Sequence, residues 1–297
     1  MKTNNSLRAW YSLITLLWLP FGLRAAPVGE SVVSGSASFD RSIPGVLNVR
    51  QFSDRTIINW QDFSIAAGES TRFYQPAPDA ALLNRVIGGN PSSIYGNLTA
   101  SGQIYLINPA GILVGPSGRI DTRGFFASTL NVSDDNFRKG GWLSLSGNSD
   151  AAVKNEGRIE ASEGGVFVIA RQVNNSGSLK APRGTVGLGG GTEVIIAKSG
   201  RDIPVIYGSG TVNNSGSIQA AAADLKAAGG NLYALAINNS GIVRATSVAN
   251  EGGRIVLRAE GGTVVNSGVL DASGSRGGVV QVLGSQVGLI DHAVVDV

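Results

Sequence analysis

Ionisable side chains that could carry catalysis or bind a metal are few in this chain and do not cluster. His292 is the single histidine and cysteine is absent, so the common imidazole and thiolate metal ligands are almost missing. The acidic residues are scattered, and the Asp134–Asp135 pair lies in a polar segment typical of a solvated loop. A polysaccharide-acting enzyme would need clustered carboxylates or basic groups on one face. We keep such an enzyme as an alternative, but the pattern favours a non-enzyme without catalytic residues, metal or cofactor.

Glycine-rich segments offer no better site for a phosphate or a cation. The run from Gly187 to Gly191 does not open a helix, so it is not expected to cradle a phosphate. The calcium-binding pattern G-G-x-G-x-D also fails here, because Thr192 and Glu193 follow the glycines. The glycines are therefore interpreted as turn residues.

Residues 1–25 have the order of a secretory signal peptide. Two basic residues precede an apolar run from Ala9 to Leu19, and the small residues Ala25 and Ala26 follow. A membrane-spanning helix needs about 20 apolar residues and this run is much shorter, so we expect no transmembrane segment after signal removal. Proline directly after a scissile bond is poorly accepted, so Pro27 favours cleavage after Ala25 and a signal peptide over residues 1–25.

The composition suits a thin core. The 297 residues include 42 glycines, twice the usual share of about 7%, with only 6% aromatic and 15% charged residues. Such a chain can fill a narrow interior with small and branched side chains.

The charge balance changes when the signal peptide is removed. Lys2, Arg8 and Arg24 leave with the signal and no acidic residue does, so 24 basic and 21 acidic residues become 21 and 21. A neutral mature chain lacks the electrostatic footprint of a nucleic-acid-binding protein, so no nucleic-acid partner is expected.

A nine-residue frame recurs after about residue 150. It has apolar residues at its first and seventh positions, Asn at the third, Gly at the fifth and Ala at the ninth. The asparagines of this frame are Asn155, Asn175, Asn214, Asn239 and Asn266. Repeats of roughly 20 to 27 residues made of short strands are typical of a parallel β-helix, in which each coil buries its apolar face on the next. We predict an all-β fold in which the five side-chain amides form a structural ladder along one corner.

Several segments depart from this period. The long interval between Asn175 and Asn214 is interpreted as two coils, one of them degenerate. Residues 133–141 are expected to form a polar surface excursion, and residues 220–228 have the helix formers of a short helix in a loop. Residues 32–71 are irregular and rich in aromatics, so we interpret them as a cap over one end of the stack. The last residues still alternate as strand without a polar cap, which favours truncation at the C-terminus.

Residues 94–126 form the central stretch of the chain. Branched apolar residues alternate with small polar ones, and Gly or Asn marks each corner, which is typical of short strands. At the centre lies Asn108-Pro109-Ala110-Gly111-Ile112. Proline fixes φ, Asn can bond locally and Gly can take a positive φ, so a tight turn is expected between two coils. We also expect a partner to recognise this turn.

The segment from residue 57 to about residue 130 resembles the secretion domain of the filamentous haemagglutinin family, the exported partner of two-partner secretion systems. The resemblance rests on IINWQDFSI at 57, GESTRF at 68, LNRVIGGNPSSIYGNL at 83, GQIYLINPAGILVG at 102 and ASTLNVS at 127. The family's N-P-N-G-I motif falls on Asn108, Pro109, Ala110, Gly111 and Ile112, with Ala110 replacing the third-position Asn. A second N-P motif corresponds to Asn90 and Pro91, although Ser92 and Ser93 then follow.

The resemblance implies a right-handed single-stranded parallel β-helix with an N-terminal β cap. Residues 26–150 would hold the cap and secretion domain, and residues 151–297 the repeat continuation. It also implies an outer-membrane β-barrel transporter as partner, with the two N-P motifs as its recognition motif. The product would reach the surface of a Gram-negative cell, or the medium, through the periplasm.

Function beyond export is left open by the sequence. We expect a secreted exoprotein or adhesin, with a host-surface or carbohydrate ligand suggested by the family name alone. The alternatives are the β-helical polysaccharide-acting enzyme, and the secretion domain of a cytolysin, a haem-acquisition protein or a contact-dependent toxin.

Overall fold

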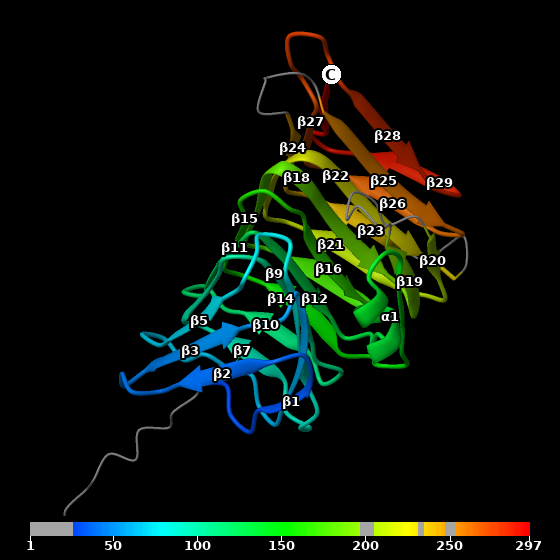
Figure 1. Cartoon of the computed structure of the whole chain (residues 1–297). Coiled ribbons are helices and arrows are strands. Elements are labelled where there is room, and N and C mark those ends of the chain that lie inside the picture. Colours follow the sequence, from blue (N-terminus) through cyan, green and yellow to red (C-terminus); the bar gives the residue numbers. More distant parts are fainter. Residues whose placement is uncertain (1–25, 197–204, 231–234, 247–252) are drawn as a thin grey trace, which may run out of the picture.

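The computed structural model describes residues 26–196, 205–230, 235–246 and 253–297 (Figure 1). The predicted signal peptide, residues 1–25, therefore lies outside the described residues. In the described part the chain winds into stacked coils, and successive coils pair through parallel strands on three faces. The predicted all-β parallel β-helix with an N-terminal cap is confirmed.

The first face is a column of parallel strands that runs the length of the stack. Its strands are β3 (Val46–Gln51), β5 (Ser70–Tyr74), β8 (Asn97–Ala100), β11 (Arg119–Thr122), β15 (Arg158–Ala161), the start of β18 (Ser178–Gly190), the start of β22 (Ser217–Ala228), β24 (Ile242–Ala245), β27 (Val269–Asp271) and β30 (Val294–Asp296).

The second face continues from the first around a corner. Its strands are β4 (Arg55–Trp60), β6 (Ala81–Val86), β9 (Gln103–Ile107), β12 (Gly124–Ser128), β16 (Val166–Ala170), the ends of β18 and β22, β25 (Arg254–Glu260) and β28 (Val279–Leu283). The long strands β18 and β22 bend from one face into the other, with a register shift between Ala181 and Thr185.

The third face closes each coil. Its strands are β7 (Ser92–Ile94), β10 (Ile112–Val114), β14 (Ala152–Asn155), β17 (Gln172–Asn175), β21 (Thr211–Asn214), β23 (Leu235–Asn239), β26 (Thr263–Asn266) and β29 (Gln286–Leu289).

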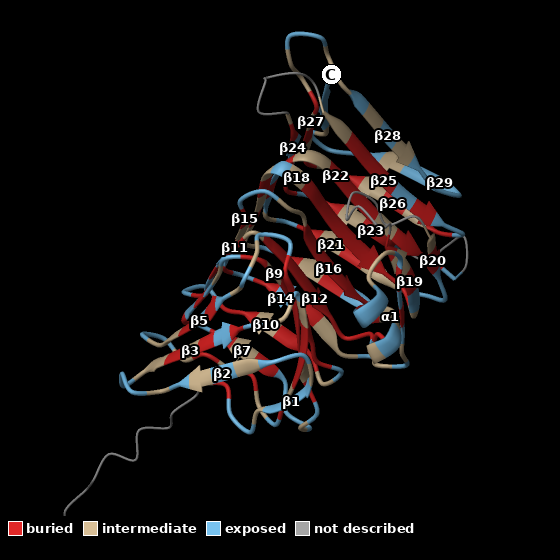
Figure 2. Ribbon diagram, in the orientation of Figure 1, coloured by how far each residue is buried: buried red, intermediate tan, exposed pale blue. Residues whose placement is uncertain are grey.

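Alternation along these strands sends apolar residues inward, because successive side chains of a strand point to opposite faces. One hydrophobic cluster runs inside the stack from Leu47 to Ala272. Buried residues follow the strands of the stack, whereas the last strands β28 and β29 are largely exposed (Figure 2).

The N-terminal end is closed by two antiparallel strands. β1 (Ser31–Ser34) pairs with β4, and β2 (Ala37–Asp40) pairs with β3. Aromatic rings fill the space beneath: Phe39 and Trp60 lie 5.8 Å apart, and Trp60 and Phe63 lie 5.5 Å apart, both edge-on. Parallel pairing already begins at β3 and β5, so the cap occupies less of residues 32–71 than the composition suggested.

A second hydrophobic cluster lies outside the stack, against the second face. It lies under α1 (Asp134–Lys139), β13 (Leu143–Ser146), β19 (Glu193–Ile196) and β20 (Val205–Tyr207). β19 pairs antiparallel with β13 and with β20, so segments distant in sequence form one small sheet. The expected excursion at residues 133–141 thus contains a short helix, begun by a hydrogen bond from Asn136 N to Ser133 Oγ.

The expectation that the interval from Asn175 to Asn214 covers two coils is wrong. β17 pairs directly with β21, and Asn175 is hydrogen-bonded to Asn214, so the interval is one coil enlarged by an excursion. The excursion includes β19 and β20, which leave the stack to join β13.

The expected helix at residues 220–228 is also wrong. These residues belong to β22, whose alanines Ala220, Ala223 and Ala227 point into the narrow interior. Pairing with β18 on one side and β25 on the other outweighs the helix propensity of alanine, which is a weak preference. Among the residues described, no helix has the length and apolar character needed to cross a membrane.

Candidate functional site

The turn between β9 and β10 holds Asn108 in the interior of the fold. Asn108 is fully buried, and its Nδ2 donates to the carbonyl of Asn90 at 3.0 Å and to Ser92 Oγ at 2.9 Å. Its Oδ1 accepts a hydrogen bond from the backbone N–H of Ala110 at 2.9 Å. The amide of Asn108 is therefore used within the fold, both to shape its own turn and to bind the coil before it.

The backbone of this turn is equally constrained. Gly111 N donates to the carbonyl of Asn108 at 3.0 Å, which closes a four-residue turn with Pro109 at its second position. Gly111 has a φ of 115°, a conformation that residues with a Cβ rarely adopt. Ile112 follows at the start of β10 and is buried in the core.

The two N-P segments belong to successive coils and lie side by side in the fold. Gly111 O accepts from Ser92 N at 2.9 Å, so the second coil also bonds back to the first. Asn90 contributes its carbonyl, and Asn90, Pro91 and Pro109 are exposed. The sequence did not predict Ser92 as a site residue, because serine at this position differs from the family motif. In the structure its hydroxyl accepts a hydrogen bond from Asn108.

Two open hollows share Ala110 as part of their walls. One, of about 340 Å³, lies over Pro91, Leu113, Lys154 and Gln172 on the third face. The other, of about 500 Å³, lies towards the end of β6 and is lined by Ile87, Gly88 and Arg85. Ala110, where the family motif has Asn, therefore lies at an accessible edge of the site, although its backbone N–H bonds to Asn108.

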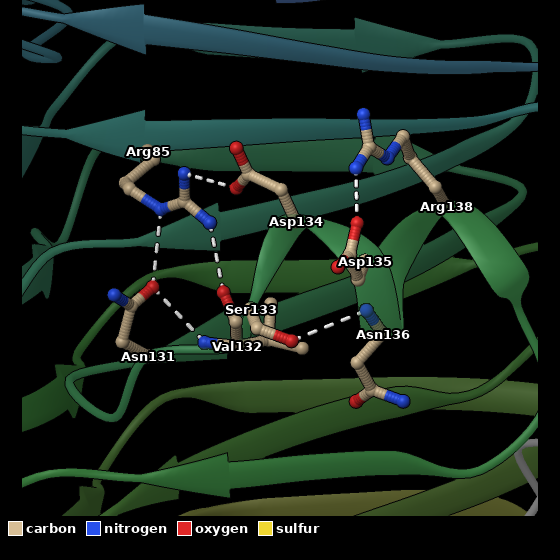
Figure 3. Close-up of polar contacts among 8 residues, drawn as sticks. All are labelled: Arg85, Asn131, Val132, Ser133, Asp134, Asp135, Asn136 and Arg138. Carbon is tan, nitrogen blue, oxygen red and sulfur yellow. Dashed lines mark hydrogen bonds and ion pairs between the residues drawn. The ribbon is translucent and has the colours of Figure 1, made fainter.

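Arg85 connects this site to the helical excursion (Figure 3). Its Nε donates to Asn131 Oδ1 at 3.0 Å, its Nη2 donates to the carbonyl of Val132 at 2.8 Å, and its Nη1 pairs with Asp134 at 2.7 Å. Because a guanidinium presents several donors in a rigid fork, one side chain on β6 orients the whole entry into α1. Arg85 lies within residues 83–98, which resemble the family. Its position in the sequence gave no sign that it would hold the start of α1.

The five repeat asparagines lie in one buried column at the end of the third face. Nδ2 of each donates to Oδ1 of the next: Asn155 to Asn175, Asn175 to Asn214 and Asn214 to Asn239 at 2.7 Å, and Asn239 to Asn266 at 2.6 Å. Each amide inside the column both donates and accepts, so burial leaves few polar atoms unpaired. This column couples coils mechanically and is separate from the Asn108 turn.

None of the predicted recognition residues is titratable, and the described residues contain no group of three or more His, Asp or Glu side chains that could hold a metal ion. What the Asn108 site offers chemically is a shaped turn with exposed Pro109 and accessible hollows beside it.

The model of the TPS secretion domain family matches residues 31–272. The chain belongs to this family of two-partner secretion domains. The match runs through the cap, both N-P segments and the asparagine column. The family is described as a secretion domain.

The relatives of this TPS domain are longer proteins. Two heme/hemopexin-binding proteins of Haemophilus influenzae are similar to it, one 33% identical over 253 residues and the other 31% identical over 262 residues. The alignments cover 80% and 79% of this chain but only 28% of each relative. The chain thus spans little more than a quarter of the curated relatives it matches.

Two solved structures share the fold of this TPS domain. The HMW1 secretion domain from Haemophilus influenzae matches with a TM-score of 0.62 at 23% identity, covering 91% of this chain and 98% of that domain. The filamentous hemagglutinin secretion domain matches with a TM-score of 0.51 at 15% identity, covering 90% and 97%. At these identities the likeness concerns the β-helical fold alone.

Proposed function

We propose that this chain is the export domain of a longer exoprotein and that an outer-membrane β-barrel transporter recognises its N-P segments before they fold. The segments are Asn90–Pro91 and the turn of Asn108, Pro109, Gly111 and Ile112. The observation that supports this proposal is the burial of Asn108, whose amide is fully engaged inside the folded corner. A transporter can contact that amide only while the corner is open.

The proposed route has three steps. A signal peptide over residues 1–25 would bring the chain to the periplasm, where residues 26–150 engage the transporter. Residues 151–297 would follow as β-helical coils that stack outside the cell. Each coil then buries its apolar face and joins the asparagine column, which disfavours return of the chain through the pore.

Export with the matching transporter co-expressed tests the proposal. Asn108→Asp places a carboxylate, which cannot donate, opposite the carbonyl of Asn90, so both export and folded stability should fall. Gly111→Val should act similarly, because valine resists a φ of 115°. The measurements are the amount of chain in the medium relative to total synthesis, and the urea midpoint of the purified chain.

Asn90→Ala separates recognition from folding. This change keeps the backbone carbonyl that Asn108 uses and removes an exposed side chain, so the urea midpoint should stay unchanged. If the transporter recognises the N-P side chains, export should nevertheless drop several-fold. Wild-type export of both Asn90→Ala and Pro109→Ala would exclude recognition through these segments.

A role of the longer exoprotein in haem acquisition is the second candidate. It is supported by the two similar proteins, whose names state that they bind heme and hemopexin. Deleting the gene should then abolish growth on hemopexin-bound haem as sole iron source, with growth on free iron salts as control. Unchanged growth would favour the adhesin role, which would appear as loss of attachment to host cells.

A further inference from the structure

A small polar pocket lies on the outer face of the cap. It is separate from the Asn108 turn between β9 and β10. Its walls are Ser38 and Asp40 of β2, Asn48 and Arg50 of β3, and Tyr74 of β5. Ser38 pairs with Arg50 and Asp40 with Asn48 across the antiparallel strands, and Arg50 pairs with Tyr74 across the parallel ones. The pocket is thus built on three adjoining strands rather than on a loop.

The side chains of this cap pocket combine hydrogen-bonding groups with one aromatic ring. The guanidinium carbon of Arg50 lies 6.0 Å from the ring centroid of Tyr74, which is 45% exposed. Asn48 Nδ2 points to Asp40 Oδ2 at 3.5 Å, too long for a strong bond. Hydrogen bonds from the side chain and the backbone of Ser42 hold the pKa of Asp40 below its usual range, so the carboxylate is a hydrogen-bond acceptor at neutral pH.

One polar atom of a residue that lines the pocket is buried without a partner. Asn48 Oδ1 is inaccessible to solvent and accepts no hydrogen bond from any residue that the structure describes. A buried polar atom left unpaired costs about 1 to 3 kcal/mol, and most such atoms in proteins are satisfied. Because this oxygen is inaccessible, Asp40 supplies the acceptor that an incoming ligand can reach, and Asn48 forms part of the wall.

The residue types indicate which ligand class fits. A carboxylate accepts hydrogen bonds from hydroxyl groups, a guanidinium donates to them, and an aromatic ring packs against C–H groups. An anion would face the charge of Asp40, and a metal ion would find a single carboxylate there. The volume of about 230 Å³ lies below the roughly 300 Å³ at which pockets for drug-sized ligands begin, so it suits about one sugar ring.

We propose that this cap pocket binds a neutral saccharide unit, with Asp40 accepting its hydroxyl hydrogens, Arg50 donating to its oxygens and Tyr74 contacting its C–H face. The site belongs to the export domain itself and does not depend on the transporter motif. Because the pocket is open and small, the affinity for a monosaccharide should be on the order of millimolar.

The test uses the whole exported chain and defined sugars. Saturation-transfer and chemical-shift NMR would be recorded with D-glucose, D-galactose, D-mannose and N-acetyl-D-glucosamine, with N-acetylneuraminic acid as an anionic sugar and glycerol as a simple polyol. At least one neutral sugar should bind and shift the resonances of pocket residues. Asp40→Asn and Tyr74→Ala should each weaken that binding about tenfold or more.

Phe52→Ala is the matched control, because Phe52 is an aromatic residue of the same region that is 56% exposed and does not line the pocket. It should leave sugar binding unchanged, and far-ultraviolet spectra of all variants should match the wild type. Binding that survives both pocket variants, preference for the anionic sugar, glycerol binding equal to that of the sugars, or no binding up to about 50 mM would each overturn the proposal.

Discussion

Asparagine and glycine define the corners of the coils for different physical reasons. Each asparagine inside the buried column supplies a donor to one neighbouring coil and an acceptor to the other, as Asn175 does between Asn214 and Asn155. The glycine that follows it in the Asn-x-Gly pattern leaves out a side chain for which there is no room. A Cβ on Gly216 would lie 2.1 Å from the carbonyl oxygen of Gly177, and one on Gly241 would lie 2.1 Å from that of Gly216. The glycine of the Asn-x-Gly pattern is therefore required by the close approach of neighbouring coils at this corner.

At the residue scale we expect Gly216→Ala to destabilise the fold by roughly 2 to 3 kcal/mol, because the clash is with backbone that neighbouring coils hold in place. The free energy of unfolding in urea measures this loss. Gly89→Ala is the control, since a Cβ there meets no atom within 4 Å. A midpoint for Gly216→Ala equal to that of Gly89→Ala would show that the coils can separate locally without penalty.

The Asn108 turn was predictable from its own residues, but its contacts with the neighbouring coil were not. Its type and position followed from Asn108, Pro109 and Gly111, because proline and positive-φ glycine impose local geometry. The partner of Asn108 did not follow, since its bonds to Asn90 and Ser92 depend on how two coils stack. Whether a transporter recognises these residues stays a prediction.

At the scale of elements, burial and pairing decided what local propensity did not. β22 contains the alanine-rich residues that favour a helix, yet it lies between β18 and β25. The excursions follow another rule, because they cover an apolar patch on the outer surface of the second face. α1 anchors there through Phe137, which is fully buried beside Tyr105, with ring centroids 5.2 Å apart.

We expect Phe137→Ala to release the excursion while the stack stays intact. The ring is also held by Arg55, whose Cζ lies 4.7 Å from the ring centroid and whose Nε bonds the Phe137 carbonyl at 2.6 Å. Removing a buried phenylalanine costs about 3 to 5 kcal/mol, here lost from α1 and its contacts. Hydrogen exchange should accelerate in α1 and β13 and stay slow in β17 and β21.

Arg138→Ala is the matched control for this experiment, because Arg138 lies on the exposed side of α1 and pairs with Asp135 at the surface. Exposed ion pairs contribute little, so exchange should change by less than about 0.5 kcal/mol in free-energy terms. Faster exchange throughout the asparagine column in Phe137→Ala would mean that stack and excursion unfold as one unit.

At the scale of the whole molecule, the outer surface carries ion pairs that should make stability depend on pH. The hydrogen bond from Arg158 lowers the pKa of Glu160, against the effect of partial burial, and Lys180 adds to the lowering. A hydrogen bond from the Ser273 side chain lowers the pKa of Asp271, with Arg244 also contributing. Groups with a lowered folded pKa bind fewer protons in the native state than in the unfolded chain.

Their stabilisation should therefore be present above the unfolded pKa of about 4 and be lost as pH falls through the lower folded values. The urea midpoint should be flat from about pH 7 to 5 and decline below about pH 4. Because these groups are partly exposed, each should contribute well under about 1 kcal/mol. Glu160→Gln should shrink the acid-induced decline, and a decline identical to the wild type would assign the effect to other carboxylates.

The order of residue types was enough to predict that the chain stacks short parallel strands around a thin core, with asparagines and glycines at regular corners. This followed because apolar alternation, amide pairing and the space for a Cβ are local demands repeated in every coil. The folded arrangement was needed to show that the Asn175–Asn214 interval is one coil with an excursion, that Asn108 bonds to the coil of Asn90, and that Arg85 holds the start of α1. Those outcomes depend on which distant apolar surfaces cover one another, and contacts of that kind leave no period in the sequence.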